Sequence, residues 1–450
     1  MTESSHKNNV PTSSNGNGSG ESHHESDNFR HPELVPSQLG NRWVSLEALV
    51  EKIESAFIES YGHDSPELAE ADTPSKRLKL VLETANYVIA VESVQLSPTE
   101  KADLISRTYS SLFGYGPLDA LFADESITTI SLEGAEKTSV RYGHGDLVSL
   151  GSIFQNTEHY QRIIARLVSD SGAELRPDQP YMELGLRIGD RPICVNLVTP
   201  PVTIQLNADI RLHPKQLPTW EALVASGFMT EKAAQLLKAL ILSNYGLLII
   251  GEPESGKTTL LNLLMNELPN PERTISVERA GETRLPTEMK RLTAKWPVGD
   301  TSGISFGEQI IHALEQKPTS ILLDEVRADE PQTIAPLLQM TDAPRQIWSF
   351  RGDTYAKRLQ SALGMLARRA EVGGSEALIR PLYERLPFVI ALNRVGGQLR
   401  LWSIGEWQFK HTPDYPTYVT LMQVEDGQLK LTGEREARSL PLDDSFWSAS

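Results

Sequence analysis

Hydrophobic residues recur at helical spacing through the part of the chain between Trp43 and about Ser111. Its first segment shows the spacing most clearly, at Val44, Leu46, Leu49, Ile53 and Phe57. Because side chains three and four residues apart share one face of a helix, this pattern predicts an amphipathic helix. Similar patterns predict helices over 77–94 and 98–113, the second opened by a capping box of Ser97 and Glu100.

The following segment mixes short strands with one helix. Alternating hydrophobic and polar residues predict strands over 128–132, 138–142, 182–188 and 193–198. Turn-forming sequences lie between the members of each pair, at 133–136 and 189–192, and the pattern over 161–169 predicts a helix. We therefore expect an α/β domain that ends near His213.

Two prolines, Pro214 and Pro218, then predict a stiff and extended linker. After it, the pattern predicts helices over 219–225 and 230–242 and a buried strand over 247–250. From there to about Ile404, strands and helices alternate as in a parallel sheet covered by helices.

Composition narrows the possible functions. A chain of 450 residues allows two to three domains at about 150 residues each. The net charge of −16 argues against a strongly basic nucleic-acid-binding protein. The single cysteine, Cys194, excludes a disulfide framework and a cysteine-based zinc cluster, and it fits a reducing compartment. No uninterrupted apolar stretch reaches the ~20 residues that span a bilayer, and the N-terminus lacks the pattern of a secretory signal.

Residues 1–40 are rich in Ser, Asn, Gly, His and Glu and contain few large apolar residues, so we expect a disordered tail. Four of the histidines fall in this segment, at His6, His23, His24 and His31. Their irregular spacing does not favour a metal site.

A phosphate-binding loop follows the predicted strand over 247–250. The sequence Gly251-Glu252-Pro253-Glu254-Ser255-Gly256-Lys257-Thr258 fits G-x-x-x-x-G-K-[ST], and the pattern after it predicts a helix over 259–268. The glycines let successive N–H groups point at phosphate oxygens. Lys257 supplies a cation near the β- and γ-phosphates, and the Thr258 hydroxyl can join a Mg²⁺ shell.

A second apolar strand, over 320–323, ends in two carboxylates, Asp324 and Glu325. A carboxylate at this edge of a neighbouring strand can hold Mg²⁺, and an adjacent one can orient or activate the attacking water. Taken alone, the pair fits an ordinary acidic strand end equally well; the preceding phosphate-binding loop favours the functional interpretation.

Six segments together carry a family resemblance: FGYGPL at 113–118, LRIGDR at 186–191, IR at 210–211, TTLLN at 258–262, SVERAGE at 276–282 and EVR at 325–327. On these, the chain from about Arg107 to about Gly405 resembles the secretion and pilus-assembly ATPases of the type II/type IV secretion superfamily. It is nearest the Tad/Flp (CpaF-like) branch.

The chain departs from that family in three places. Arg279 replaces the usual Asp of the acidic segment called the Asp box, and Asp324 replaces a Gly before the acidic Walker B residue. Ala343 and Arg351 stand where the histidine box has its two histidines. The resemblance links those histidines to γ-phosphate sensing, so their loss weakens the expectation of a fast motor while leaving nucleotide binding intact.

The resemblance also implies site residues. The expected catalytic group is Glu325, Glu278, Glu282, Arg187, Arg191 and Arg211. The three arginines would reach the γ-phosphate from the N-terminal domain; each also fits an ordinary solvated strand or turn position. The expected ATP-binding residues are Gly251, Glu252, Pro253, Glu254, Ser255, Gly256, Lys257, Thr258, Thr259 and Asp324, with Thr258 and Asp324 as Mg²⁺ ligands.

The implied architecture is α/β, with a helical and α/β N-terminal part followed by a RecA-like P-loop ATPase domain. Its expected divisions are a disordered tail (1–40), a helical region (41–112), an α/β domain (113–213), a linker (214–218) and the ATPase domain (219–450).

The implied function is an ATPase motor subunit that powers pilus assembly or protein secretion. Its implied partners are five further copies in a hexamer and a platform protein of the cytoplasmic membrane, with the chain on the cytoplasmic side and no direct nucleic-acid partner. A nucleotide-binding scaffold or regulatory subunit with little hydrolysis remains the alternative, because the histidine box is lost. A metabolite kinase is disfavoured, since nothing resembles a lid or an acceptor site.

Overall fold

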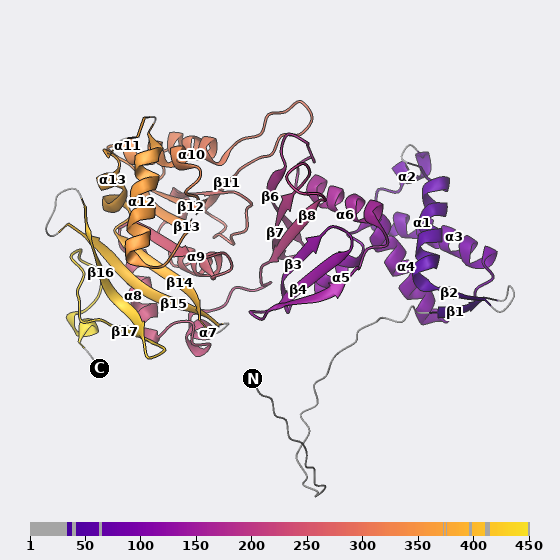
Figure 1. Ribbon diagram of the computed structural model, residues 1–450, viewed down its shortest axis with the longest axis horizontal. Coiled ribbons are helices and arrows are strands. Elements are labelled where there is room, and N and C mark those ends of the chain that lie inside the picture. The colour runs from indigo at the N-terminus through magenta and orange to yellow at the C-terminus, as the bar shows by residue number, and fades with distance from the viewer. Residues whose placement is uncertain are drawn as a thin grey trace, which may run out of the picture. The chain divides into compact units, whose positions relative to one another are not determined.

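We describe the protein from a computed structural model, which describes residues 34–37, 42–62, 65–371, 373–374, 376–395, 398–409 and 415–448. The chain divides into two compact units, Met1–Leu104 and Ile105–Ser450. Each unit is described separately (Figure 1). No helix in the described part of the chain has both the length and the apolar character needed to cross a membrane.

The first unit contains a two-stranded ribbon and a set of helices. Its elements are β1 (Leu34–Ser37), β2 (Arg42–Ser45), α1 (Leu46–Ser60), α2 (Pro66–Glu70), α3 (Pro74–Val91) and the start of α4 (Pro98–Phe113). The periodic positions Leu49 and Ile53 of α1 are fully buried, as are Val81 and Ala85 of α3, and the two helices pack together. The predicted capping box of α4 is present, because Ser97 and Glu100 exchange two hydrogen bonds.

Strand β1 lies inside the 1–40 segment, for which the sequence predicts disorder. The remainder of that segment, with its four histidines, lies outside the described residues. Its predicted disorder therefore stays a prediction.

The second unit begins with an antiparallel sheet in the order β5-β4-β3-β8-β7-β6. Its elements are α5 (Pro117–Ala123), β3 (Ile127–Glu133), β4 (Lys137–Tyr142), β5 (Leu147–Gly151), α6 (Thr157–Asp170), β6 (Tyr181–Ile188), β7 (Arg191–Val198) and β8 (Asn207–Leu212). One face buries Ile130, Leu184 and Ile210 in a core shared with α5 and α6. Because side chains alternate across a strand, the neighbouring residues Thr129, Gly185 and Arg211 belong to the opposite face.

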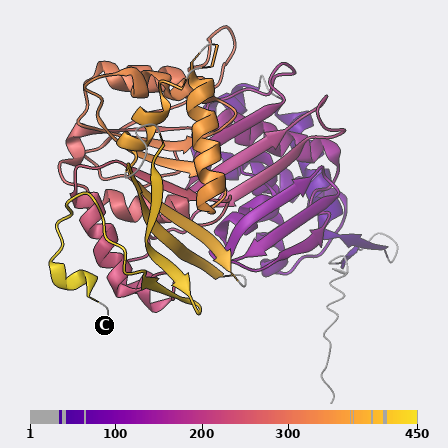
Figure 2. The ribbon, with the colours of Figure 1, turned by 60° about the vertical axis from the view of Figure 1, so that its left-hand side comes forward.

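A nine-stranded sheet forms the rest of the second unit, in the order β11-β10-β12-β13-β9-β14-β15-β16-β17 (Figure 2). Its strands are β9 (Leu247–Gly251), β10 (Thr274–Glu278), β11 (Lys290–Thr293), β12 (Ser320–Val326), β13 (Arg345–Arg351), β14 (Phe388–Val395), β15 (Gln398–Gln408), β16 (Thr417–Glu425) and β17 (Gln428–Leu431). The pairs from β11 to β14 are parallel, and those from β14 to β17 are antiparallel.

Helices cover both faces of this sheet. They are α7 (Trp220–Ala225), α8 (Glu231–Leu242), α9 (Lys257–Met265), α10 (Phe306–Glu315), α11 (Ala335–Gln339), α12 (Ala356–Ala370) and α13 (Ile379–Arg385), with single 3₁₀ turns at Pro271–Arg273, Pro331–Ile334 and Asp444–Trp447. Alternate residues of β9 divide between two cores: Leu247 and Ile249 pack with α7, α8 and α9, and Leu248 and Ile250 with α10 to α13.

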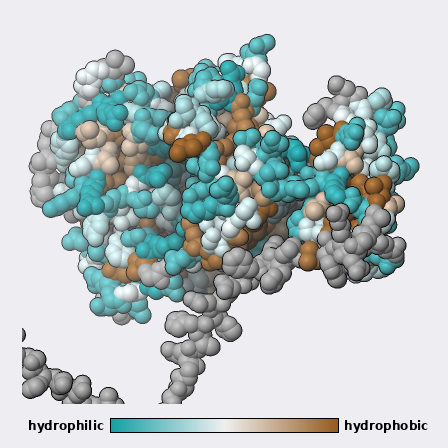
Figure 3. Space-filling view, turned by 45° about the vertical axis from the view of Figure 1, so that its right-hand side comes forward, coloured by the Kyte–Doolittle hydropathy of each residue, from teal (hydrophilic) through white to brown (hydrophobic). Residues whose placement is uncertain are grey.

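This architecture confirms the predicted α/β class. Strand β13 separates β9, which precedes the phosphate-binding loop, from the acidic strand β12, and this order is RecA-like. The parallel alternation expected up to about Ile404 stops earlier, because β15 reverses direction and pairs antiparallel with β14. Large hydrophobic residues are exposed at scattered positions such as Tyr87, Ile204 and Tyr355, and Figure 3 shows small hydrophobic groups among hydrophilic residues on the face drawn.

Candidate nucleotide site

The phosphate-binding loop connects the end of β9 at Gly251 to the start of α9 at Lys257. Gly256 is the N-cap residue of α9 and has a φ of 92°, which favours glycine. No side chain caps this helix end, so its first N–H groups remain available to an anion. The local sequence therefore builds the expected cradle.

Lys257 lies at the centre of the site and is 6% exposed. Its ammonium group donates to the carbonyl oxygens of Gly251 and Glu252, at 2.9 Å each. It also lies 3.2 Å from a carboxylate oxygen of Glu325. The structure thus brings the predicted lysine and the predicted Walker B glutamate into direct contact.

The carboxylate before Glu325 has a different environment. Asp324 is buried and accepts a 2.6 Å hydrogen bond from Ser349 of β13. Burial raises the pKa of Asp324 to about 8, and the nearby Glu282 carboxylate adds to this rise. A nearby cation would favour the ionised form of this carboxyl group.

Two further predicted carboxylates lie at and beyond the end of β10. Glu278 is 1% exposed and accepts hydrogen bonds from Ser276 at 2.8 Å and from Arg291 at 2.9 Å. Glu282 lies 2.5 Å from His213 and 3.8 Å from Arg211. Burial acts to raise the pKa of Glu282, but Arg211 and His213 outweigh it and lower the pKa to about 2. Glu282 is therefore an ionised carboxylate at neutral pH.

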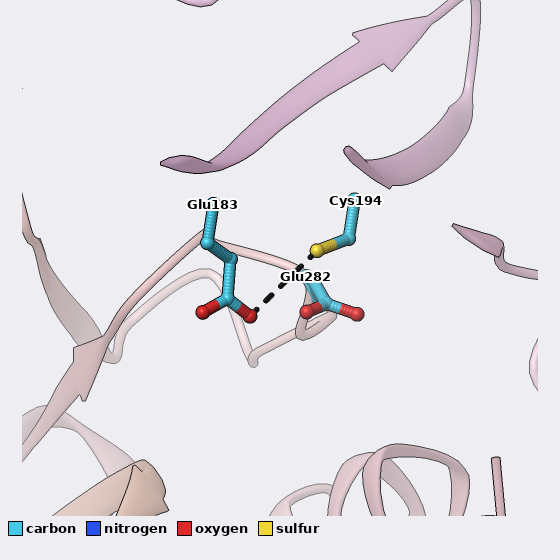
Figure 4. Close-up of side chains that lie close together, drawn as sticks. All are labelled: Glu183, Cys194 and Glu282. Atoms are coloured by element: carbon cyan, nitrogen blue, oxygen red, sulfur yellow. Dashed lines mark hydrogen bonds between the residues drawn. The ribbon is translucent and has the colours of Figure 1, made fainter. Parts of the chain in front are cut away.

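Arg211 joins the N-terminal sheet to this group of acids. Its guanidinium lies 3.6 Å from Glu183, 3.8 Å from Glu282 and 3.6 Å from the sulfur of Cys194. Figure 4 shows that Glu183, Cys194 and Glu282 converge, with their ligand atoms within 4.8 Å of one another. Because Arg211 contacts all three, its guanidinium already supplies the cation of this cluster, and a metal ion there would face a fixed positive charge.

The other two predicted arginines lie elsewhere. Arg191 is 2% exposed, and its guanidinium donates to the carbonyl oxygens of Phe122, Asp124, Ile127 and His213. A guanidinium held by four main-chain carbonyls is not free to bind a phosphate, so the structure gives Arg191 a structural role.

Arg187 is exposed and lines an open cavity of 610 Å³ with Lys215, Arg284 and Arg291. Its guanidinium donates to the carbonyl oxygen of Asp190, and within the described part of the chain no hydrogen bond or ion pair joins it to Lys257 or Glu325. Arg351, which replaces the second histidine of the histidine box, is exposed at the end of β13 and lies opposite Gly251 in the ladder with β9.

Arg279, which the resemblance aligns with the usual Asp of the Asp box, anchors the main chain of β12. It donates to the carbonyl oxygen of Glu325 at 2.8 Å and makes two hydrogen bonds to Glu330. Its guanidinium also lies 4.4 Å from the ring centre of Phe306. It thereby fixes the main chain at the Walker B glutamate.

Sequence reasoning missed the residues that the N-terminal sheet contributes besides Arg211. Glu183 forms an ion pair with Arg327, and Thr129 and Arg141 bind Glu254 of the phosphate-binding loop. More than a hundred residues separate the partners in each of these contacts, so no local pattern marks them.

The residues present fit a nucleotide with Mg²⁺. The hydroxyl oxygen of Ser255 is buried without a hydrogen-bond partner among the described residues, in the loop that would surround a phosphate. Thr258 follows Lys257 in the first turn of α9, where its hydroxyl could join a metal shell together with Asp324. Pro253 and Thr259 complete the predicted loop and the start of its helix.

Comparison with known proteins agrees with this site. Residues 134–341 match the family model described as Type II/IV secretion system protein. The chain is 26% identical over 241 residues to "Putative conjugal transfer protein Rv3659c" of Mycobacterium tuberculosis, covering 52% of this chain and 68% of the relative. It is 37% identical over 97 residues to the type IV secretion system protein PtlH of Bordetella pertussis, covering 21% of this chain and 29% of the relative. These matches show that the chain is similar to type II/IV secretion system proteins over this part of its length.

Solved structures with a detectable likeness include the VirB11 ATPase of Brucella suis, at 20% identity and a TM-score of 0.31, covering 66% of this chain and 97% of that one. The ATPase DotB of Legionella pneumophila follows at 13% identity and a TM-score of 0.43, covering 69% of this chain and 80% of that one. At these scores the likeness adds no argument to the family match.

Proposed function

We propose that the chain is an ATP-hydrolysing motor subunit of a secretion or pilus-assembly machine. One observation carries the proposal: Lys257 of the phosphate-binding loop lies 3.2 Å from Glu325 at the end of the acidic strand β12. A cation for the phosphates and a carboxylate for water thus meet at one point, with β13 between their strands.

Each residue has a defined task in the proposed reaction. The main chain of 251–258 and Lys257 bind the phosphates of ATP. Thr258 and Asp324 would hold Mg²⁺, which supplies charge neutralisation across the phosphate oxygens. Glu325 accepts a proton from the water that attacks the γ-phosphorus, while the bond to the bridging oxygen breaks and leaves ADP.

Arg211 contributes positive charge from the N-terminal sheet. Because it is held by Glu183 and Glu282, we assign Glu282 to its positioning. Glu278 forms an ion pair with Arg291, and we assign it to holding the main chain next to Glu282. The Tad/Flp branch, the hexamer, the membrane platform partner, the cytoplasmic location and the five-part division of the chain belong to this proposal, and they rest on the resemblance.

The alternative is a scaffold that binds ATP and hydrolyses it very slowly. Ala343 and Arg351 at the histidine-box positions favour it, since both histidines are lost. Single-turnover hydrolysis by the purified oligomer, with Glu325→Gln as the reference, separates the two. A wild-type rate about 10²-fold or more above the variant supports the motor; equal rates with intact ATP binding support the scaffold.

A further inference from the structure

The phosphate-binding loop contains a residue that local geometry disfavours. Glu254 has a φ of 60°, in the left-handed region where a side chain with a Cβ is uncommon. Glycine would fit this position without strain. Such a residue persists when its surroundings hold it, and strained positions of this kind concentrate at ligand-binding sites.

The N-terminal sheet holds Glu254 through both carboxylate oxygens. One oxygen accepts a 2.7 Å hydrogen bond from the Thr129 hydroxyl, and the other forms an ion pair with Arg141. Thr129 and Arg141 are directly opposite one another in the β3–β4 ladder. The carboxylate therefore bridges a cross-strand pair, and the side chains of Glu254 and Arg141 are only 27% and 17% exposed.

Two hydrogen-bond donors near Glu254 remain without a partner in the part of the chain that the structure describes. The Nε of Arg141 is buried and has no hydrogen-bond partner among the described residues, and the same holds for the hydroxyl of Ser255, the next residue of the loop. Buried donors are nearly always paired. Arg141 and Ser255 therefore each have a donor left for a further acceptor, and phosphate oxygens are the acceptors that this loop is built for.

The charged groups around Arg141 also favour binding of phosphate at this place. Arg394 of β14 lies close enough to Arg141 to act on its charge, so two guanidinium groups gather near the loop. Asp146, in the turn between β4 and β5, is the acidic group that acts on Arg141. A polyanion would be attracted to this region, and Glu254 is the loop carboxylate that competes with it for Arg141.

We propose that Arg141 is a phosphate-binding residue and that Glu254 competes with the phosphates for its guanidinium. The carboxylate holds the guanidinium beside the loop, and the phosphates of an incoming nucleotide take the guanidinium over. This exchange of Glu254 for phosphate at Arg141 couples nucleotide binding to the contact between the N-terminal sheet and the loop. The proposal rests on the proposed function.

A double-mutant cycle on the full chain tests the exchange, with the affinity for Mg²⁺ and a fluorescent ATP analogue as the readout. Glu254→Gln keeps the side-chain shape and should raise affinity about tenfold, since it removes the competitor. Arg141→Gln should lower affinity about tenfold. In the double variant the gain from Glu254→Gln should shrink to about twofold, because only direct repulsion of the phosphates is then relieved.

Glu252→Gln is the matched control. Glu252 lies in the same loop and is exposed, with no side-chain hydrogen bond or ion pair among the described residues. It removes the same charge, but its effect should be identical with and without Arg141. Equal gains from both glutamate variants, or additive effects of Glu254→Gln and Arg141→Gln, would overturn the exchange.

Two further measurements guard against a merely structural effect. Thr129→Val deletes only the hydrogen bond from Thr129 to Glu254 and should raise the affinity for the ATP analogue about threefold. An unchanged affinity counts against the proposal, and this variant keeps the test valid if Arg141→Gln fails to fold. In steady state, Glu254→Gln should lower KM by a larger factor than it changes kcat. If the wild type binds no more nucleotide than Lys257→Ala does, the proposed function fails, and the exchange fails with it.

Discussion

Lys257 has three oxygen partners in this structure: two carbonyls of its own loop and Glu325. Lys257→Ala should leave the fold intact, because its partners are the loop and one partly exposed carboxylate. Affinity for ATP should fall by about 100-fold, since a charge-assisted bond to phosphate is lost. Nucleotide titration and circular dichroism check both statements, with the exposed Lys357→Ala on α12 as the control. A folded variant with unchanged affinity would contradict the assignment of the loop.

Glu325→Gln separates binding from chemistry. Hydrolysis should fall by about 10²-fold or more, because the variant cannot accept a proton from water. Affinity for ATP should stay the same or rise, since Lys257 loses an ion-pair partner and becomes free for phosphate. Asp329→Asn is a control on the segment after β12, where the carboxylate is exposed. Equal rates for Glu325→Gln and the wild type would remove Glu325 from the reaction.

Glu282 gives the chain a measurable acid sensitivity. Its pKa is lowered to about 2 in the folded protein, against about 4.3 in an unfolded chain. A carboxylate with a lowered pKa stabilises the fold above the unfolded pKa, and this contribution is lost as the pH falls from about 4.3 towards 2. Glu282→Gln should therefore flatten the pH dependence of the free energy of unfolding in that window.

At pH 7 the same variant should cost on the order of 2 kcal/mol, since Arg211 and His213 lose an ionised partner. Urea unfolding between pH 2.5 and 7 measures both effects. The exposed Glu288→Gln serves as the control and should follow the wild-type curve. A slope for Glu282→Gln that matches the wild type would show that Glu282 is not held ionised by these partners.

At the scale of elements, the sequence predicted the parts of the site that depend on short stretches of chain. The loop over 251–258 and the acidic end of β12 follow from local patterns, and Glu278 and Glu282 follow from the family motif at 276–282. The sequence did not predict β5 or β8. All residues of β5 are exposed, so no hydrophobic period marks it, and β8 is defined by its pairing with β3 and β7.

The three predicted arginines show the same limit. Each was placed by its motif, but among the described residues only Arg211 of the three forms an ion pair with Glu282. Arg191 stands at the first residue of β7, where carbonyls from α5 and the following loop surround it. Side-chain direction at a strand end depends on neighbours that are distant in sequence, and a motif does not contain that information.

Gly185 shows how closely β6 meets the half of the second unit that contains the nine-stranded sheet. A Cβ placed on Gly185 would lie 1.4 Å from the main-chain oxygen of Ala280, between Glu278 and Glu282. Gly185→Ala must therefore move β6 away from this segment. We expect a loss of about 1–3 kcal/mol in stability, typical of overpacking, and at least a tenfold loss of hydrolysis, because Arg211 moves with the sheet.

Gly364→Ala on α12 is the matched substitution. Nothing lies within 4 Å of its added Cβ, and alanine in a helix should raise stability by about 0.5–1 kcal/mol. Thermal unfolding and hydrolysis assays compare the two variants. Normal hydrolysis by a folded Gly185→Ala protein would show that the N-terminal sheet is not needed for the reaction.

At the scale of the whole molecule, the second unit combines two sheets whose polar surfaces meet at the site. The N-terminal sheet turns its core towards α5 and α6 and contributes Arg211 and Arg141 from the other face. The nine-stranded sheet contributes the loop after β9 and the carboxylates at the ends of β10 and β12. Neither sheet alone carries the complete set of charges.

The order of the nine strands also determines which strands lie at the edges of this sheet, where a strand of another chain could be added. Its two outer strands, β11 and β17, have four residues each and carry lysine or arginine, while the long β15 and β16 lie inside. Short, charged outer strands leave little unpaired backbone for another strand to join, and this protects a sheet from edge-to-edge aggregation. In the other sheet, the outer strand β5 exposes Leu147, Val148 and Leu150. Unwanted strand addition would therefore begin at β5, and a lysine at one of these positions should slow aggregation of the concentrated protein.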